Sequence, residues 1–240
     1  MKKTYVLVHG AFAGKYAWDE VKLILEKNGN KVVTLDLPGH GDDNTAPLDV
    51  TFESYMNAVV TVINNEPGKV ILVGHSMGGV VVSAVAEKIP MKIEKLVYLS
   101  AYIPMSGQSL QELAGMDGES QIGPNLKFTQ DYSGAYLTGE VTVKVFAGDC
   151  SDAIKKLVVE KSEGRLEPLA AFQAKPILTD NFKDVEKYYI ITLQDIGVGT
   201  TLQKKMIAAN GTIKKIFTID CGHSAYFAKP TELAGILESL

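Results

Sequence analysis

The chain has 240 residues, of which 46% are hydrophobic and 22% charged, so it is long enough to bury a full core as one domain with an insertion. Its net charge is -4 and the sequence has no run of lysine or arginine, which argues against nucleic acid or an anionic membrane as a partner. No stretch is long and apolar enough to cross a bilayer, so we expect no membrane insertion.

Short apolar runs rich in β-branched residues alternate with segments of helical periodicity. The runs predict parallel strands at residues 5–8, 32–35, 70–73, 96–99, 189–192 and 216–219. The segments between them predict helices at residues 16–27, 52–64, 79–88, 201–209 and 231–240. This alternation predicts an α/β fold with a doubly wound, mainly parallel sheet of about six strands. In such a sheet the ligand cleft lies at the carboxyl ends of the strands.

The sequence Gly74-His75-Ser76-Met77-Gly78 has the pattern of a nucleophile elbow. It follows the apolar run at residues 69–73 and precedes the helical segment at 80–88, as a strand-to-helix turn requires. Small residues at the flanking positions allow the strained turn that exposes a serine hydroxyl. The alternative is a glycine-rich turn in which Ser76 only caps the helix.

The regular alternation stops between residues 102 and 187, where proline and glycine recur at short intervals. Residues 151–159 and 166–172 have helical character, so we expect an inserted, mainly helical cap at 102–187. We expect it to leave and rejoin the sheet on the side of the elbow and to cover the active site as a mobile cap. The core domain with the sheet then comprises residues 1–101 and 188–240. Disorder is disfavoured because this segment carries apolar side chains, among them Phe128, Tyr132, Tyr136, Leu137 and Leu157.

A serine nucleophile needs a base, and the chain offers four histidines. His223 follows the last predicted strand, which is the position of the base in a serine, acid, histidine order. His75 is the variable residue of the elbow. His9 and His40 follow the first two strands, where we expect them to shape turns beside the cleft. We therefore assign His223 as the base.

The acid that orients the base is expected at the end of the preceding strand. Asp195 stands there, just as the backbone leaves the sheet. Asp220 is the main rival, although it precedes His223 by only a few residues, and Asp184 and Asp180 are further candidates. A structural interpretation of Asp195 is that it merely caps the helix that follows.

A tetrahedral oxyanion requires preorganised N–H donors. Met77 follows the nucleophile at the start of a helix, where amide groups are unpaired and the helix dipole favours negative charge. Ala11 lies in the loop after the first strand. We expect the backbone N–H groups of Ala11 and Met77 to form the oxyanion hole.

Other chemistry is not indicated. The sequence has no cysteine and histidine cluster with zinc spacing and no phosphate or dinucleotide fingerprint, so we expect no cofactor and no metal. Cys221 is more typical of an inert buried thiol than of a nucleophile. Cys150 and Cys221 cannot form a disulfide framework, and the apolar run after Lys3 is too short for a signal peptide. We expect a cytoplasmic protein.

Taken together, these motifs resemble the α/β-hydrolase superfamily over nearly the whole chain. They are Val6-Leu7-Val8-His9-Gly10-Ala11, Leu35-Asp36-Leu37-Pro38-Gly39-His40-Gly41, Val73-Gly74-His75-Ser76-Met77-Gly78-Gly79, Asp195 and Gly222-His223. Within it, the modest cap is similar to that of the plant methylesterase and hydroxynitrile lyase group. The resemblance implies a triad of Ser76, Asp195 and His223 with the Ala11 and Met77 amides as oxyanion hole.

Two positions distinguish the branches of this group. The resemblance implies that lyases carry a threonine after the first-strand histidine and a lysine after the catalytic histidine. Gly10 and Ser224 stand at these positions here, which favours the esterase branch.

We therefore predict a carboxylesterase-type serine hydrolase that acts on a small-molecule ester through an acyl-enzyme. The alternatives are a hydroxynitrile lyase-like or other carbon–carbon bond-cleaving enzyme, and a low-turnover receptor for a small ligand on the same fold. The sequence does not identify the acid or the alcohol of the substrate. A homodimer is possible but not specified.

Overall fold

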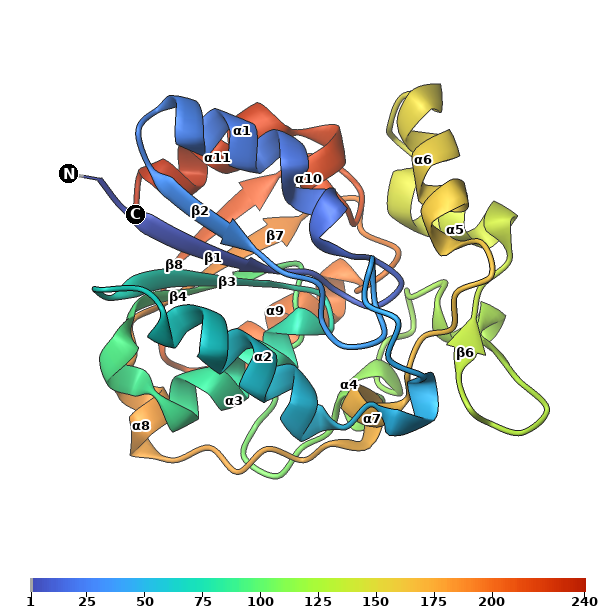
Figure 1. Cartoon of the computed structure of the whole chain (residues 1–240), viewed down its shortest axis with the longest axis horizontal. Coiled ribbons are helices and arrows are strands. Elements are labelled where there is room, and N and C mark those ends of the chain that lie inside the picture. The colour runs from blue at the N-terminus through green and yellow to red at the C-terminus, as the bar shows by residue number, and fades with distance from the viewer. Residues whose placement is uncertain (1) are drawn as a thin grey trace.

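The computed structural model describes residues 2–240, and its centre is a parallel sheet of six strands (Figure 1). In spatial order they are β2 (Lys31–Thr34), β1 (Thr4–Val8), β3 (Val70–His75), β4 (Ile93–Leu99), β7 (Lys187–Thr192) and β8 (Ile213–Ile219). All neighbours pair in parallel. Each predicted strand is present, and the predicted α/β fold class is confirmed.

Helices cover both faces of the sheet (Figure 1). One face carries α1 (Asp19–Lys27), α10 (Ala225–Ala228) and α11 (Pro230–Glu238). The other carries α2 (Phe52–Asn64), α3 (Gly78–Lys88), α8 (Asp180–Asp184) and α9 (Thr200–Asn210). Short 3-10 turns complete the core: η1 (Lys15–Trp18), η2 (Pro47–Asp49) and η3 (Pro90–Lys92).

The two faces bury separate hydrophobic clusters because successive side chains of a strand point to opposite sides. Tyr5 and Leu7 of β1 pack with Trp18 beneath α1 and α11. Val6 and Val8 point the other way, into the cluster beneath α2 and α3. Complete burial of a large aliphatic side chain contributes about 1.5–3 kcal/mol, so this alternation holds β1 firmly in place.

The part of the chain from α4 to α7, between β4 and β7, forms the cap, which lies beyond the carboxyl ends of the strands (Figure 1). Its elements are α4 (Leu110–Ala114), η4 (Gly123–Asn125), β5 (Lys127–Phe128), β6 (Ala135–Tyr136), α5 (Gly139–Ala147), α6 (Asp152–Ser162) and α7 (Ala170–Gln173). The helix expected at 151–159 is present as α6. The prediction of a helix at 166–172 is wrong for its first half, since α7 begins at Ala170. Glu167 instead pairs with Ala135 in a β-bridge, and the proline that follows it disfavours helical geometry at position 167.

The expectation that this segment rejoins the sheet on the elbow side is wrong. Since β7 runs parallel to β4, it begins at the amino ends of the strands, which is the end of the sheet opposite the elbow. The chain must therefore pass along the whole length of the strands to reach it. The last part of the crossover packs into the core: Leu178, Phe182 and Val185 are buried in the cluster beneath α3. Only the earlier part of the segment stands above the site.

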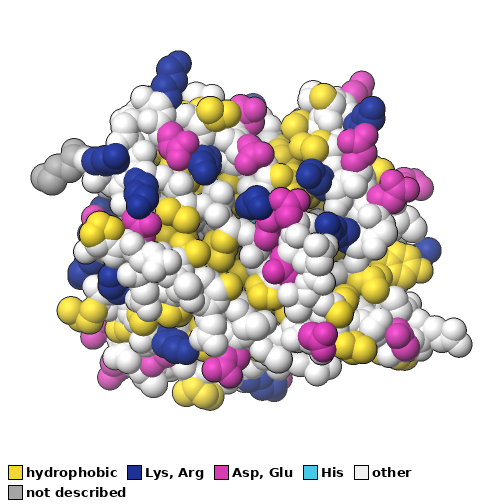
Figure 2. All heavy atoms as spheres, in the orientation of Figure 1, with side chains coloured by type: hydrophobic (Ala, Val, Ile, Leu, Met, Phe, Trp, Pro, Cys, Tyr) yellow, Lys and Arg dark blue, Asp and Glu magenta, His cyan; other side chains and the backbone are white. Residues whose placement is uncertain are grey.

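The surface carries charges of both signs. On the face that Figure 2 shows, lysine and arginine alternate with aspartate and glutamate, and no histidine is visible. All four histidines of the chain are buried. Within residues 2–240, no helix is long and apolar enough to cross a membrane.

Candidate active site

Ser76 occupies the sharp turn between β3 and α3. Its φ of +53° lies in the left-handed region, which is uncommon for a residue with a side chain and is characteristic of strained functional turns. A Cβ on Gly74 would lie 2.6 Å from Val82, and one on Gly78 would lie 2.6 Å from the carbonyl oxygen of His9. The turn therefore requires glycine on both sides of the serine.

The helix-cap interpretation of Ser76 has no support in this geometry. The residue before α3 is Met77, and no side chain among the described residues makes a capping hydrogen bond there. Ser76 instead lines a cavity of about 500 Å³ beneath the cap, together with Ala11 and Met77. The turn thus presents the serine to a space large enough for a small substrate.

His223 lies in the loop after β8, and its ring is fully buried. Its Nδ1 atom donates a hydrogen bond to Oδ2 of Asp195 at 2.9 Å. The other ring nitrogen, Nε2, is buried and has no hydrogen-bond partner within residues 2–240. With the proton on Nδ1, the lone pair of Nε2 is available to accept a proton.

Asp195 sits at the turn after β7, where its carboxylate is surrounded by donors. Oδ1 accepts the backbone N–H groups of Gly197 at 2.7 Å and Val198 at 2.9 Å. Oδ2 accepts from Thr192 and Gln203 as well as from His223. So many donors stabilise the ionised carboxylate and fix its orientation toward the imidazole.

Thr192 and Gln203 are site residues that the sequence analysis missed. The Thr192 hydroxyl lies 2.8 Å from Oδ2 of Asp195 and 2.6 Å from the Ser100 hydroxyl. Gln203 Nε2 lies 3.1 Å from the same carboxylate oxygen. A signal existed for Gln203, since it is a polar residue on the buried side of α9, beside Leu202.

The other candidate acids lie elsewhere. Asp220 is exposed and accepts a hydrogen bond from Gln194 at 2.8 Å. Asp180 and Asp184 lie in α8, just before β7 begins. They are therefore near the amino ends of the parallel strands, at the end of the sheet opposite the elbow. Of the four, Asp195 is the carboxylate that contacts His223.

His75, the variable residue of the elbow, joins the elbow to the loop of His223. Its Nε2 donates to the carbonyl oxygen of His223 at 3.0 Å, and the two rings lie 4.5 Å apart. Burial, and secondarily the proximity of His223, holds the pKa of His75 well below its usual value. His75 is thus a neutral structural link between the two segments.

Ala11 and Met77, the residues predicted to supply the oxyanion donors, both line the cavity beside Ser76. Within residues 2–240, neither N–H donates a hydrogen bond to another group. Unpaired amides beside a nucleophile are suited to bind a developing negative charge. The geometry therefore brings both predicted donors to the same cavity as Ser76.

His9 and His40 are not among the described residues that line this cavity. His9 Nε2 accepts the N–H of Leu37 at 3.0 Å, and its Nδ1 lies 2.8 Å from the carbonyl oxygen of Gly10. Burial, with a smaller contribution from His40, lowers the pKa of His9 to about 3. As expected, both histidines are attached to turns beside the cleft.

The cavity is mainly apolar. Its wall includes Tyr102, Leu110, Ile122, Leu126, Phe128 and Phe172. Polar groups are fewer, among them Gln111, Gln173 and Asp117. Within residues 2–240, no cluster of three histidine, cysteine or acidic residues could hold a metal ion.

Comparison with curated proteins finds plant methylesterases. The putative chloroplastic methylesterase 11 of Arabidopsis thaliana is 29% identical over 247 residues, which cover 97% of this chain and 62% of that protein. Salicylic acid-binding protein 2 of Nicotiana tabacum is 29% identical over 252 residues, covering 98% of this chain and 96% of that protein. The chain thus spans less than two thirds of the first relative and nearly all of the second.

Solved structures show the same similarity. Polyneuridine aldehyde esterase superposes with a TM-score of 0.87 at 25% identity, covering 100% of this chain and 99% of the other. A methylesterase from Arabidopsis has the same fold, with a TM-score of 0.86 at 24% identity and coverage of 99% and 98%. These relatives confirm the predicted similarity to plant methylesterases and support the prediction of an esterase-type hydrolase. Residues 5–236 match the sequence model of the alpha/beta hydrolase family, and the chain belongs to that family.

Proposed function

We propose that this protein is a serine hydrolase that cleaves small, neutral carboxylic esters through an acyl-enzyme. The observation that carries the proposal is the arrangement of Ser76 in a left-handed turn at the wall of a 500 Å³ cavity, with a buried His223–Asp195 pair in the adjoining loop. Similarity to methylesterases and to an esterase of the same fold supports ester hydrolysis as the reaction class.

In the first half of the reaction, the Ser76 hydroxyl oxygen attacks the ester carbonyl carbon. Nε2 of His223 takes the hydroxyl proton, and Asp195 stabilises the resulting imidazolium through its hydrogen bond to Nδ1. The carbonyl oxygen becomes an oxyanion that accepts from the N–H groups of Ala11 and Met77. Collapse of this intermediate breaks the ester C–O bond, and the alcohol leaves with the proton from His223.

In the second half, His223 removes a proton from water as the water attacks the acyl carbon. The same two amides stabilise the second oxyanion. When that intermediate collapses, the bond from the acyl carbon to Ser76 breaks and the serine recovers its proton from His223. The carboxylic acid is released and the free enzyme is restored.

The cavity favours an uncharged, apolar substrate. Among the described residues that line it, none is lysine, arginine or histidine, and one acidic residue, Asp117, is present. A substrate carboxylate would therefore lose its hydration without gaining a positive partner. We expect neutral esters with aliphatic or aromatic groups to be preferred over esters that carry a free acid.

Labelling by a fluorophosphonate tests the nucleophile. Wild-type protein is expected to be labelled and to hydrolyse nitrophenyl esters, whereas Ser76→Ala should lose both reactions because no hydroxyl remains at the elbow. Ser83→Ala is the matched control, since Ser83 is buried in α3 and donates to the carbonyl oxygen of Gly79. Unchanged labelling of the Ser76→Ala protein would contradict the proposal.

Parallel assays separate the two alternatives. A lyase would cleave mandelonitrile faster than it hydrolyses esters, but Gly10 and Ser224 lack the side chains that the lyase branch uses at these positions. A low-turnover receptor would form a lasting stoichiometric complex. Release of acid and alcohol in amounts many times greater than the amount of protein, without comparable cleavage of mandelonitrile, favours the hydrolase over both.

A further inference from the structure

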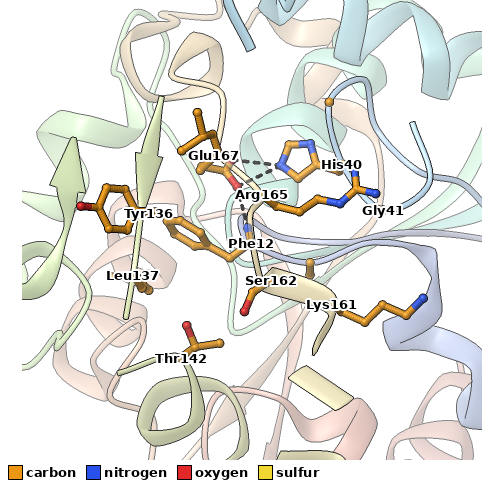
Figure 3. Close-up of a pocket in the computed structure, with 13 residues that line it drawn as sticks. Phe12, His40, Gly41, Tyr136, Leu137, Thr142, Lys161, Ser162, Arg165 and Glu167 are labelled. Carbon is orange, nitrogen blue, oxygen red and sulfur yellow. Dashed lines mark hydrogen bonds and ion pairs between the residues drawn. The ribbon is translucent and has the colours of Figure 1, made fainter. Parts of the chain in front are cut away.

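A buried carboxylate lies where the cap meets the loops at the ends of β1 and β2. It belongs to Glu167, whose side chain is fully buried and points between His40 and Phe12 (Figure 3). The His40 Nε2 atom lies 3.1 and 3.0 Å from the two oxygens of Glu167. One of these oxygens also accepts the backbone N–H of Phe12 at 2.6 Å. A cap residue thus reaches the loop that supplies the Ala11 amide.

The contacts of His40 indicate that this pair is ionic. Its second nitrogen, Nδ1, lies 3.1 Å from the carbonyl oxygen of Pro38, so both ring nitrogens face acceptors and both act as donors. Burial alone would lower the pKa of His40, but the charge and hydrogen bonds of Glu167, the carbonyl group of Pro38 and the charge of Asp36 outweigh it and raise the pKa. The buried charge of Glu167 is therefore compensated.

The backbone of Glu167 is also held on the cap side. Its N–H donates to the carbonyl oxygen of Ala135 at 2.7 Å, and its own carbonyl accepts from Ala135 at 3.0 Å. These bonds attach Glu167 to β6, as a third segment of the small hairpin. The carboxylate is thus carried by ordered backbone and is not the tip of a free loop.

The loop that receives this carboxylate is strained. Phe12 has a φ of +59°, which is unfavourable for a residue with a large side chain and persists only when neighbouring contacts fix it. The Phe12 N–H belongs to the peptide group that follows Ala11. A short hydrogen bond from this N–H to a buried carboxylate fixes that peptide group, and with it the position of Ala11 beside Ser76.

We propose that Glu167, held by His40, is a positioning residue for the oxyanion hole. The cap does more than cover the substrate, because it supplies the acceptor that keeps the Ala11 amide aimed at the reacting carbonyl. The proposal rests on the proposed ester hydrolysis at Ser76. Glu167 itself does not touch the substrate and acts through the loop of Phe12.

The hydrogen bonds of Glu167 to His40 and to the Phe12 N–H determine which substitutions test the proposal. Glu167→Gln retains an oxygen for the Phe12 N–H and an amide that can donate to neutral His40, so we expect kcat within about threefold of wild type. Glu167→Met leaves the Phe12 N–H without an acceptor and His40 without its partner. Because that variant can fail to fold, the double variant His40→Leu with Glu167→Met replaces the whole pair by apolar groups, an exchange that proteins often tolerate.

The decisive measurements are kcat, KM and inhibition by an aryl trifluoromethyl ketone, whose serine adduct carries an oxyanion. For the double variant we expect a folded protein whose kcat falls about tenfold to a hundredfold, with KM within about threefold of wild type. Binding of the ketone should weaken by a similar factor. A role in cap packing alone would instead change KM and thermal stability and leave kcat and ketone binding intact.

Arg165→Ala is the matched control. Arg165 also links the cap to the turn after β2, through a hydrogen bond of 3.3 Å to the carbonyl oxygen of Asp43, but within residues 2–240 it makes no hydrogen bond to Phe12. This variant should retain the wild-type kcat. If wild-type protein is labelled by a fluorophosphonate and the double variant keeps the wild-type kcat, the positioning role is overturned while the hydrolase proposal stands. If wild-type protein is not labelled at Ser76, both proposals fall together.

Discussion

A Cβ atom on Gly10 would lie 2.7 Å from the Cβ of Ser76, so the loop after β1 touches the elbow at a position with room for hydrogen alone. The same atom would lie 3.0 Å from Nδ1 and 3.1 Å from the carbonyl oxygen of His75. This close approach places Ala11, the next residue, in the wall of the same cavity as Ser76. A side chain at position 10 would force the two segments apart.

Gly10→Ala should therefore impair hydrolysis. The added methyl group displaces either the oxyanion loop or the elbow, and a small misplacement of an oxyanion donor is costly. We expect kcat to fall about tenfold or more while the protein remains folded, as measured with a nitrophenyl ester and circular dichroism. Gly68→Ala is the control, because nothing lies within 4 Å of a Cβ at that position. Equal activity of the two variants would contradict the prediction.

Asp195→Asn should cost far more activity than Asp220→Asn. An amide at position 195 cannot stabilise the imidazolium of His223, and in comparable triads this exchange lowers kcat by about four orders of magnitude. Asp220 is exposed and its contact is Gln194, so its substitution should change kcat by less than about twofold. Steady-state kinetics of the two variants at one pH provide the comparison. A mild effect at position 195 would require another acid.

Thr192→Val should reduce both activity and stability. Valine has the shape of threonine but removes the hydroxyl that bridges Ser100 and Asp195, leaving two buried polar groups with one partner fewer. We expect a loss of about 1–3 kcal/mol in the free energy of unfolding, measured by urea denaturation, and a severalfold lower kcat. Thr61→Val is the control, because within residues 2–240 the Thr61 hydroxyl has one hydrogen-bond partner, the carbonyl oxygen of Asn57 in the preceding helical turn. A stability loss of equal size in both variants would contradict the bridging role.

Strands and site residues were predictable to the extent that local sequence determines them. Buried parallel strands are continuous apolar runs, and the elbow is a short motif, so the sheet and Ser76 could be located from sequence. The hairpin of β5 and β6 and helix α5 were missed, because the two strands have two residues each and the surrounding glycines and prolines dominate the pattern.

Glu167 could not have been found from its sequence context. It lies 127 residues from His40 and 155 residues from Phe12, and its sequence neighbours, Leu166 and Pro168, do not distinguish it from a solvated glutamate. Its role depends on the tertiary contact between the cap and the loops. The end of the sheet at which the chain re-enters was predictable, because a strand at 189–192 that is parallel to the others must begin at the end opposite the elbow.

Two of the buried histidines, His9 and His75, make the fold sensitive to mild acid. His9 and His75 are fully buried, and burial is the main cause that lowers the pKa of His9 to about 3 and that of His75 well below its usual value. In the unfolded chain both titrate near about pH 6.5. Below that pH the unfolded chain binds protons that the folded chain refuses, so stability falls as the pH decreases from about 6.5 toward about 3.

Each such histidine contributes a slope of about 1.4 kcal/mol per pH unit within this window. His9→Gln removes one of them and retains an acceptor for the Leu37 N–H, which His9 accepts at 3.0 Å. The free energy of unfolding, measured with urea at about pH 6.5, 6.0, 5.5 and 5.0, should therefore decrease less steeply with falling pH for His9→Gln than for wild type. The difference in slope should be about the contribution of one histidine. This range lies above the usual carboxylate pKa values, so acidic groups contribute little to the difference. Parallel slopes for the two proteins would mean that His9 is protonated in the folded state, which its accepted hydrogen bond from Leu37 does not allow.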